Sequence, residues 1–561
     1  MTPVKVSSEW KGFRVMRKRL IAPAAVAFAC ALVCGGAAQA QFGRGVPEWG
    51  TAGGDAHRSS SVTSDVKISK ESMSKPGFAL FWKMKLNNEP RQLNSLMAPT
   101  LMDQHIGIHG FRSFGFVTGS GDNLYTVDTD LARVEWQKNF GGKASAEASP
   151  ACPGGITTGT AHFISAAFAT APRGGGRGRG GGGAKSAVGE PDEGGVQVAQ
   201  LARAAAAAAA NPGRGGRGPA APAGRGPRVP VVVHTLSSDG MFHANYVSNG
   251  DEPDVPIRFL PANAHAQGLV IVDNVAYVAT VNGCGGVPNG VWALDIASKT
   301  VTSWKPASGE IAGNEGVAFG GDGTVYVSTT GGDLVSLEPK TLKVKDAHRV
   351  GQELTSTPVV FQQKEKTMLA ATTKDGRLYL LDAAAMSGPG VKSAPYATAG
   401  DFVPGALATW QDAAGTRWIL VPSAGAVAAD ANFSNVNGAV TNGAIVAWKV
   451  VEQNGAAALE PGWVSRDMVS PMTPVVINGV VFAVSSGEAR GKGPKMTAAQ
   501  VAKASAPAVV YALDGDTGKE LWSSGKTITS FARGGLSGGA GQIYLGTHDG
   551  TLYSFGFPIE H

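Results

Sequence analysis

The sequence predicts an all-β protein, a β-propeller of eight four-stranded antiparallel blades closed by an N-terminal strand, and three observations predict it. Paired β-runs flank Gly/Asp turns, as in β-hairpins. The pairs recur every forty to sixty residues, which indicates radial repetition. A lone strand pattern precedes the first pair. Seven blades is the alternative, because the second unit is degraded.

The repeated hairpin is clearest in five segments, which are residues 115–128, 325–337, 368–382, 509–522 and 543–555. The full set of units begins with 91–140 and with an interrupted second unit that starts near 147 and resumes near 231. The remaining units are 265–305, 314–347, 354–395, 401–465, 467–526 and 531–557. Many units open with an x-Pro dipeptide, because proline suits the first residue of a strand, where a lost donor costs least.

The last unit lacks the outer, Trp-containing strand that the other clear units carry. Residues 78–86 supply a single strand with the missing Leu/Phe-Trp pattern. We therefore expect this N-terminal strand to complete the last blade, which would leave no free edge between the first and last blades.

The chain divides into a secretory signal at 1–40, a lead-in at 41–77 and the propeller at 78–561, with a low-complexity insertion at 172–228 inside blade two. The signal has a basic cluster at 17–19, an apolar run at 20–33 that is too short to span a bilayer, and a small-residue cleavage site at 38–40. A membrane anchor is the alternative. We expect a periplasmic or secreted protein with no membrane span after cleavage.

Charge and composition exclude a nucleic-acid-binding face on the folded body. Of the formal net charge of +6, the signal carries +5 and the insertion +6, which leaves −5 for the rest.

The Gly/Arg/Ala-rich insertion cannot bury a core, so we expect a disordered surface loop; RNA binding by its Arg-Gly tracts is the alternative. Another long loop, 487–506, is expected to project from blade seven.

Two cysteines, Cys152 and Cys284, remain after signal cleavage. A disulfide between them and a pair of buried free thiols are equally compatible with an exported protein. No Cys-x-x-Cys-His motif and no Cys/His cluster with zinc spacing occurs, so neither haem c nor zinc is expected. The scattered histidines, such as His162 and His548, are interpreted as polar loop or turn residues.

The repeat resembles that of the pyrroloquinoline-quinone (PQQ) propeller superfamily, with residues 510–522 as the best match and about 49–561 covered apart from the insertion. The lead-in at 49–58 also resembles that family. The resemblance implies the propeller fold. It leaves activity open, because the superfamily contains PQQ-dependent alcohol and sugar dehydrogenases as well as cofactor-free scaffolds.

Polar residues precede the innermost strands, and in a propeller these positions converge at the mouth of the central channel. They are Arg91, Asn94, Glu147, His265, Asn314, Glu315, Glu353, Asp401, Asp467 and Arg533. Carboxylate and amide oxygens there could hold Ca²⁺, and arginines could clamp the carboxylates of a quinone. The alternative is that these side chains cap strand ends and face channel water.

The resemblance implies specific roles if the protein is an enzyme. Asp401 would be the general base, Asn314 and Glu315 would bind Ca²⁺, and Arg533 would contact the quinone or an oxyanion, with Arg91, Asn94 and His265 completing the cofactor site. The dehydrogenases cover the quinone with a disulfide between adjacent cysteines, and this chain has no adjacent cysteines. Some sugar dehydrogenases also lack that disulfide.

Two functions follow from the sequence. The first is an exported propeller that acts as a ligand-binding or scaffold module, with a small molecule or an envelope protein at the channel mouth. The alternative is a periplasmic quinoprotein oxidoreductase that uses PQQ and Ca²⁺ on an alcohol or sugar. A polysaccharide-binding propeller is a third hypothesis.

Overall fold

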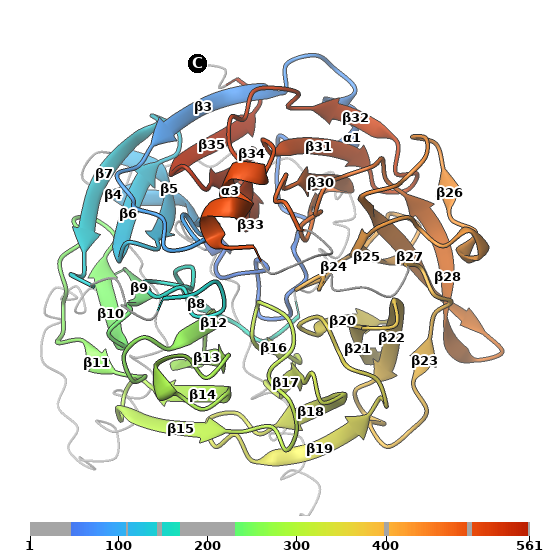
Figure 1. The fold of residues 1–561 in the computed structure, drawn as a ribbon, viewed down its shortest axis with the longest axis horizontal. Coiled ribbons are helices and arrows are strands. Elements are labelled where there is room, and N and C mark those ends of the chain that lie inside the picture. Colours follow the sequence, from blue (N-terminus) through green and yellow to red (C-terminus); the bar gives the residue numbers. More distant parts are fainter. Residues whose placement is uncertain are drawn as a thin grey trace, which may run out of the picture. The chain divides into compact units, whose positions relative to one another are not determined.

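The computed structural model describes residues 47–107, 110–142, 148–168, 231–397, 403–490 and 496–558. Eight sheets are arranged as blades around a central channel (Figure 1), which confirms the eight-bladed prediction. The predicted signal at 1–40 and the insertion at 172–228 lie outside the described residues. In the described part of the chain, no helix has the length and apolar composition needed to cross a membrane.

The first four blades follow the chain in order. Blade one consists of β1 (Pro47–Trp49), β4 (Thr100–Gly107), β5 (Gly110–Gly119), β6 (Asn123–Asp128) and β7 (Arg133–Asn139). Blade two consists of β9 (Val232–Leu236), β10 (Met241–Tyr246) and β11 (Ile257–Arg258). Blade three consists of β8 (Phe163–Ile164), β12 (His265–Val272), β13 (Val275–Val281), β14 (Gly290–Asp295) and β15 (Thr300–Trp304). Blade four consists of β16 (Ala318–Phe319), β17 (Val325–Ser328), β18 (Asp333–Leu337) and β19 (Val344–Arg349).

The last four blades complete the ring. Blade five consists of β20 (Val359–Gln363), β21 (Lys366–Thr373), β22 (Arg377–Asp382) and β23 (Val391–Lys392). Blade six consists of β24 (Ala408–Gln411), β25 (Arg417–Ala424), β26 (Ser434–Asn435), β27 (Gly443–Gln453) and β28 (Ala456–Val464). Blade seven consists of β2 (Ser61–Val62), β29 (Val475–Ile477), β30 (Val480–Ser485), β31 (Val509–Asp514) and β32 (Glu520–Ser523). Blade eight consists of β33 (Ala532–Gly539), β34 (Gln542–Thr547), β35 (Thr551–Gly556) and β3 (Ala79–Lys85).

The N-terminal strand closes the ring as predicted. β3 pairs antiparallel with β35 and forms the outer strand of blade eight, so the chain ends are joined in one sheet. The indole of Trp82 is buried, and its Nε1 donates a hydrogen bond of 2.9 Å to the Thr129 carbonyl of blade one. The described part of the degraded second unit has three strands, and the bridge between Ala161 and His234 takes the place of an inner strand.

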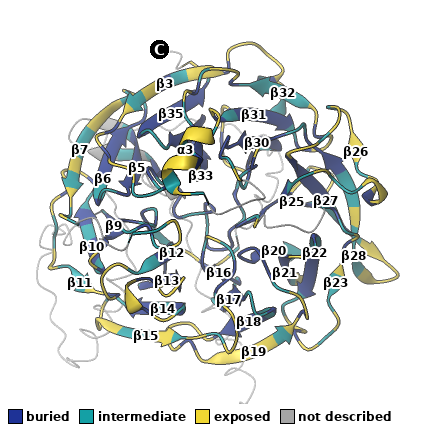
Figure 2. Cartoon of the chain, in the orientation of Figure 1, coloured by how far each residue is buried: buried dark blue, intermediate teal, exposed yellow. Residues whose placement is uncertain are grey.

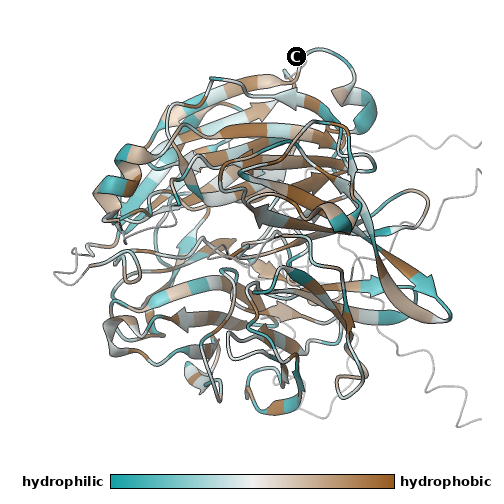
Figure 3. Ribbon diagram, turned by 45° about the vertical axis from the view of Figure 1, so that its right-hand side comes forward, coloured by the Kyte–Doolittle hydropathy of each residue, from teal (hydrophilic) through white to brown (hydrophobic). Residues whose placement is uncertain are grey.

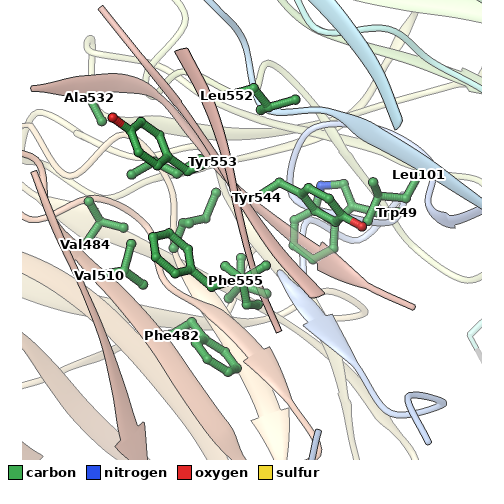
Figure 4. Close-up of a cluster of buried hydrophobic side chains, with 14 of the residues drawn as sticks. Trp49, Leu101, Phe482, Val484, Val510, Ala532, Tyr544, Leu552, Tyr553 and Phe555 are labelled. Atoms are coloured by element: carbon green, nitrogen blue, oxygen red, sulfur yellow. The ribbon is translucent and has the colours of Figure 1, made fainter. Parts of the chain in front are cut away.

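The hydrophobic core lies between neighbouring blades. The inner and middle strands are buried, and exposed residues gather on outer strands such as β7, β15 and β19 (Figure 2). Apolar residues run along the stacked strands when the ring is seen obliquely (Figure 3). The largest cluster packs Phe482 and Val510 of blade seven against Phe555 and Tyr544 of blade eight, and extends to Trp49 (Figure 4). Strands such as β13 and β34 are buried along their whole length, because each blade packs against a neighbouring blade on both faces.

The lead-in forms a belt, defined here as residues 49–62, which passes along the inner strands of successive blades. Its backbone carbonyls accept hydrogen bonds of 2.8–3.0 Å from inner-strand or neighbouring backbone N–H groups, which are the pairs Gly50–His162, Ala56–Phe319, His57–Val360, Ser59–Thr409 and Ser60–Val476. Asp65, just beyond the belt, accepts from the N–H of Gly541 in blade eight at 2.7 Å. The belt therefore connects blades that are distant in sequence.

The loop at 487–506 differs from its prediction. It carries the helix α3 (Ala498–Ala504), which packs over the channel cavity and lines it with Ala498 and Val501. Val501 on this helix is buried against Leu93 and Phe531. The apolar contact explains the difference, because a helix with a buried valine gains from packing over the channel. The other helices among the described residues are short, namely α1 (Lys70–Met73), η1 (Cys284–Gly286) and η2 (Ala429–Ala431).

Candidate functional site

A cavity with a volume of about 1440 Å³ lies in the central channel. Segments that precede the inner strands of several blades form its walls, the belt residues Trp49, Gly53 and Ser60 line its inner end, and α3 contributes Ala498 and Val501. Ligand pockets in proteins commonly have volumes of about 300–1,000 Å³. The cavity is therefore large enough for a substantial organic molecule.

Half of the predicted mouth residues meet in this cavity. Asn94, His265, Asn314, Glu315 and Arg533 all line it. Arg91 lies behind the wall: its backbone pairs with Asn94, and its side chain packs beside Gly155.

Two other predicted residues have structural partners instead. Glu353 accepts a hydrogen bond from Lys374 at 2.7 Å, and Asp467 accepts backbone N–H bonds from Thr441 and Asn442 at 2.9 and 2.7 Å. The predicted base Asp401, and Glu147, lie outside the described residues. Asp467 therefore caps the start of β27, as in the alternative interpretation, in which the polar residues cap strand ends.

Two arginines share one buried carboxylate on the side of the cavity formed by blades seven and eight. Arg533 Nη1 lies 3.1 Å from Glu488 Oε1, and Arg490 Nη2 lies 3.0 Å from Glu488 Oε2. The Glu488 side chain is only 5% exposed, while the two arginines are 35–40% exposed. Burial lowers the pKa of Arg533, and Glu488 opposes that shift. We call these three residues the arginine wall.

Asn314 and Glu315 line the cavity from blade four. The Glu315 N–H donates to Thr357 Oγ1 at 3.0 Å, which fixes the backbone. Glu315 Oε2 is buried and has no hydrogen-bond partner among the described residues. Burial raises the pKa of Glu315 to about 7, although Arg58 acts to lower it. The carboxyl group therefore sits in an environment that stabilises its charge poorly.

Gly53 of the belt makes room for this carboxyl group. Its φ is +68°, and a Cβ atom there would lie 2.5 Å from Glu315 Oε2. Any side chain at position 53 would therefore displace Glu315, as well as strain the backbone.

Arg58 holds the belt beneath Glu315. The side chain is 1% exposed. Its Nε donates to the Val317 carbonyl at 2.8 Å and its Nη2 to the Gly268 carbonyl at 2.9 Å. Nη1 donates to Thr51 Oγ1 at 3.1 Å and to the Ala52 carbonyl. Arg58 therefore joins the belt to blades three and four, and burial lowers its pKa to about 10.

A disulfide joins Cys152 to Cys284 beside the cavity, with Cα atoms 5.4 Å apart. The sequence left this pairing open. The carbonyl of Ala151, next to Cys152, lies 2.8 Å from His265 Nδ1 and accepts from Asn282 Nδ2 at 3.0 Å. The disulfide thus fixes the segment before blade two against blade three, at the wall where His265 faces the cavity.

A Ser–His–Glu arrangement in blade two is a structural turn. Ser237 Oγ lies 2.8 Å from His243 Nε2, and His243 Nδ1 lies 2.6 Å from Glu252 Oε1. Ser237 also donates to Asp239, as Thr373 donates to Asp375 and Thr547 to Asp549 in the equivalent turns of blades five and eight. The adjacent cavity is about 10 Å³, which admits one water molecule and no acyl substrate.

Solved structures of quinoprotein dehydrogenases resemble the whole ring. Quinohemoprotein alcohol dehydrogenase from Comamonas testosteroni has a TM-score of 0.51 at 12% identity, over 91% of this chain and 82% of that one. A europium-containing methanol dehydrogenase has a TM-score of 0.50 at 11% identity, over 91% and 98%. BamB from Moraxella catarrhalis has a TM-score of 0.43 at 14% identity, over 86% and 99%.

This chain has the same overall fold as these two dehydrogenases. The TM-scores of the two dehydrogenases support this, and at 11–12% identity the similarity shows the fold alone. No protein-family model and no curated protein sequence matches the chain.

Sequence reasoning missed three charged residues of this site. Glu488 and Arg490 belong to the loop that was expected to project away, and Arg58 belongs to the lead-in. Among the described residues, no group of three or more His, Cys, Asp and Glu side chains is placed to hold a metal ion. A useful signal for the arginine wall would have been the Glu-Ala-Arg run at 488–490, directly after the apolar strand at 480–485.

Proposed function

We propose that the protein is an exported binding module that takes an organic anion into its central cavity. The observation that carries the proposal is the arginine wall, in which two arginines facing the cavity share one buried carboxylate. Both guanidinium groups are 35–40% exposed beside Glu488. A carboxylate ligand in the cavity could therefore accept hydrogen bonds from both arginines.

Export is part of the proposal. The signal pattern at 1–40 directs the chain out of the cytoplasm, and the bond between Cys152 and Cys284 suits an oxidising compartment such as the periplasm or the extracellular space. A small molecule suits the cavity better than an envelope protein, because α3 reaches over it.

A thermal melt tests the proposal with benzene-1,3,5-tricarboxylate, a rigid anion without redox chemistry. A ligand at a hundred times its Kd stabilises the folded state by roughly 2.7 kcal/mol, so we expect a rise in Tm that grows with concentration and falls with added salt. The neutral 1,3,5-benzenetricarboxamide is the control. Equal shifts with both compounds, or no shift with the acid, would contradict the proposal.

The second candidate is a PQQ- and Ca²⁺-dependent oxidoreductase, and the pairing of Asn314 with Glu315 favours it. The cavity residues fit this cofactor in part: Arg490 and Arg533 would hold its carboxylates, and Asn314 and Glu315 would offer oxygen atoms to Ca²⁺. When bound, PQQ supplies the electron acceptor for oxidation of an alcohol. Asp401 is the residue proposed to take the hydroxyl proton.

Calcium dependence separates the two candidates in the same assay. The oxidoreductase predicts a PQQ-induced rise in Tm that EDTA abolishes and Ca²⁺ restores. The anion-binding module predicts a rise that persists in EDTA.

A further inference from the structure

The side of the cavity facing the arginine wall is lined by Glu315, whose Oε2 is buried and has no hydrogen-bond partner among the described residues. Glu315 belongs to blade four and Arg533 to blade eight, and these blades lie across the channel from one another (Figure 1). Both residues line the same cavity. A ligand that fills it can therefore meet the arginines with one end and Glu315 with the other.

The protein holds Glu315 firmly in this position. Its backbone N–H is fixed on Thr357, and the neighbouring Asn314 N–H donates to the Gly405 carbonyl at 3.2 Å. Gly53 leaves space for the carboxyl group underneath. Because Oε2 is buried without a donor, the carboxyl group is poorly solvated, and a ligand hydroxyl that donates to the part of Glu315 lining the cavity would stabilise it. Asn314 is exposed beside it and offers both a donor and an acceptor.

The donor that fits best is a neutral hydroxyl group. The charge of the buried Arg58 acts on Glu315 from the belt. A ligand ammonium group would place a second cation near Arg58, which costs energy in a buried site. A hydroxyl group brings a hydrogen without a charge, and Asn314 can accept or donate at a neighbouring hydroxyl.

We propose that the ligand is a hydroxylated carboxylic acid of the sugar-acid class. Its carboxylate binds Arg490 and Arg533, and its hydroxyl groups bind Glu315 and Asn314. Met97 and Met472 also line the cavity, and their flexible side chains can pack against the carbon skeleton. This inference rests on the proposed function, because it assigns the second end of the same site.

Equilibrium titration with three ring compounds of similar size tests the inference. Galacturonate carries the carboxylate and hydroxyls, cyclohexanecarboxylate carries the carboxylate alone, and galactose carries hydroxyls alone. We expect galacturonate to bind about tenfold more tightly than either of the others, because each of them lacks one set of charge-assisted hydrogen bonds.

Variants at position 315 locate the hydroxyl contact. Glu315→Leu removes the acceptor at similar volume, and we expect it to bind galacturonate and cyclohexanecarboxylate equally. Glu315→Gln keeps an acceptor oxygen and should retain most of the preference. Melting curves establish that each variant folds. If Glu315→Leu does not fold, Asn314→Ala replaces it, and we expect the same loss of preference for galacturonate.

The outcomes separate the two proposals. Equal binding of the two acids by the unmodified protein, or a preference that survives in Glu315→Leu, would overturn the hydroxyl assignment and leave anion binding intact. Failure of both acids to bind would overturn anion binding itself. Galactose binding as tightly as galacturonate would remove the role given to the carboxylate.

Discussion

The Arg58→Met variant is expected to lose about 3–5 kcal/mol of unfolding free energy, the range found when one member of a buried charged network is removed. Methionine fills a similar volume but makes none of the hydrogen bonds. The carbonyl groups of Ala52, Gly268 and Val317 would lose the guanidinium donor, and the belt would lose its attachment to blades three and four. Urea denaturation measures the loss.

Arg417→Met is the matched control for Arg58→Met. Arg417 is partly buried, with its pKa lowered to about 10 by burial, but it donates only one described hydrogen bond, of 3.0 Å, to the Gln362 carbonyl. We expect less than half the loss seen at Arg58. Equal losses would show that burial of a long side chain, rather than the belt contacts, explains the effect.

The folded protein is expected to lose stability steeply below pH 6.5 because of two buried histidines. His162 and His234 are each 2% exposed and lie in neighbouring inner segments of blade two. Burial lowers the pKa of His162 to about 3, with a smaller contribution from His234, and burial lowers the pKa of His234 to about 4. Phe116 packs edge-on against His162, and Phe242 stacks on His234.

The sign follows from where the protons bind. Below pH 6.5 the unfolded chain takes up protons on these imidazoles and the folded chain does not, so the free energy of unfolding falls as the pH drops toward 4. At pH 5 each histidine accounts for a loss of about 2 kcal/mol relative to pH 7.5.

Urea denaturation from pH 4.5 to 7.5 measures this slope. In His162→Gln and in His234→Gln the slope should decrease by about one proton each, and in the double variant by about two. A slope that is unchanged in the double variant would assign the acid sensitivity to other groups.

The hairpin repeat predicted the blades because strand pairing in a propeller is local. Each blade uses strands adjacent in sequence, so the alternation of apolar residues and Gly/Asp turns is enough to locate them. The closure by residues 78–86 was also predictable, since a missing outer strand and a lone strand pattern complement each other.

The site was harder to predict because it depends on contacts between distant segments. The belt meets inner strands hundreds of residues away, and nothing in residues 49–62 shows that Arg58 is buried. His162 was interpreted as a polar loop residue, yet its side chain is buried. The sequence did not show this, because the pattern of the second unit is too degraded to reveal its inner segment. The position of Arg490 depends on the path of the loop at 487–506. The helix of that loop packs against Leu93 and Phe531 through one buried residue, Val501.

Calorimetric titration of benzene-1,3,5-tricarboxylate into three arginine variants tests the central claim most directly. Arg490→Gln and Arg533→Gln should each weaken binding about tenfold or more, because a hydrogen bond to a charged group contributes about 1.5–3 kcal/mol. Arg466→Gln is the control: Arg466 pairs with Glu520 at 2.7 Å and does not line the cavity. Its affinity should match that of the unmodified protein. Unchanged affinity in both cavity variants would contradict binding at the arginine wall.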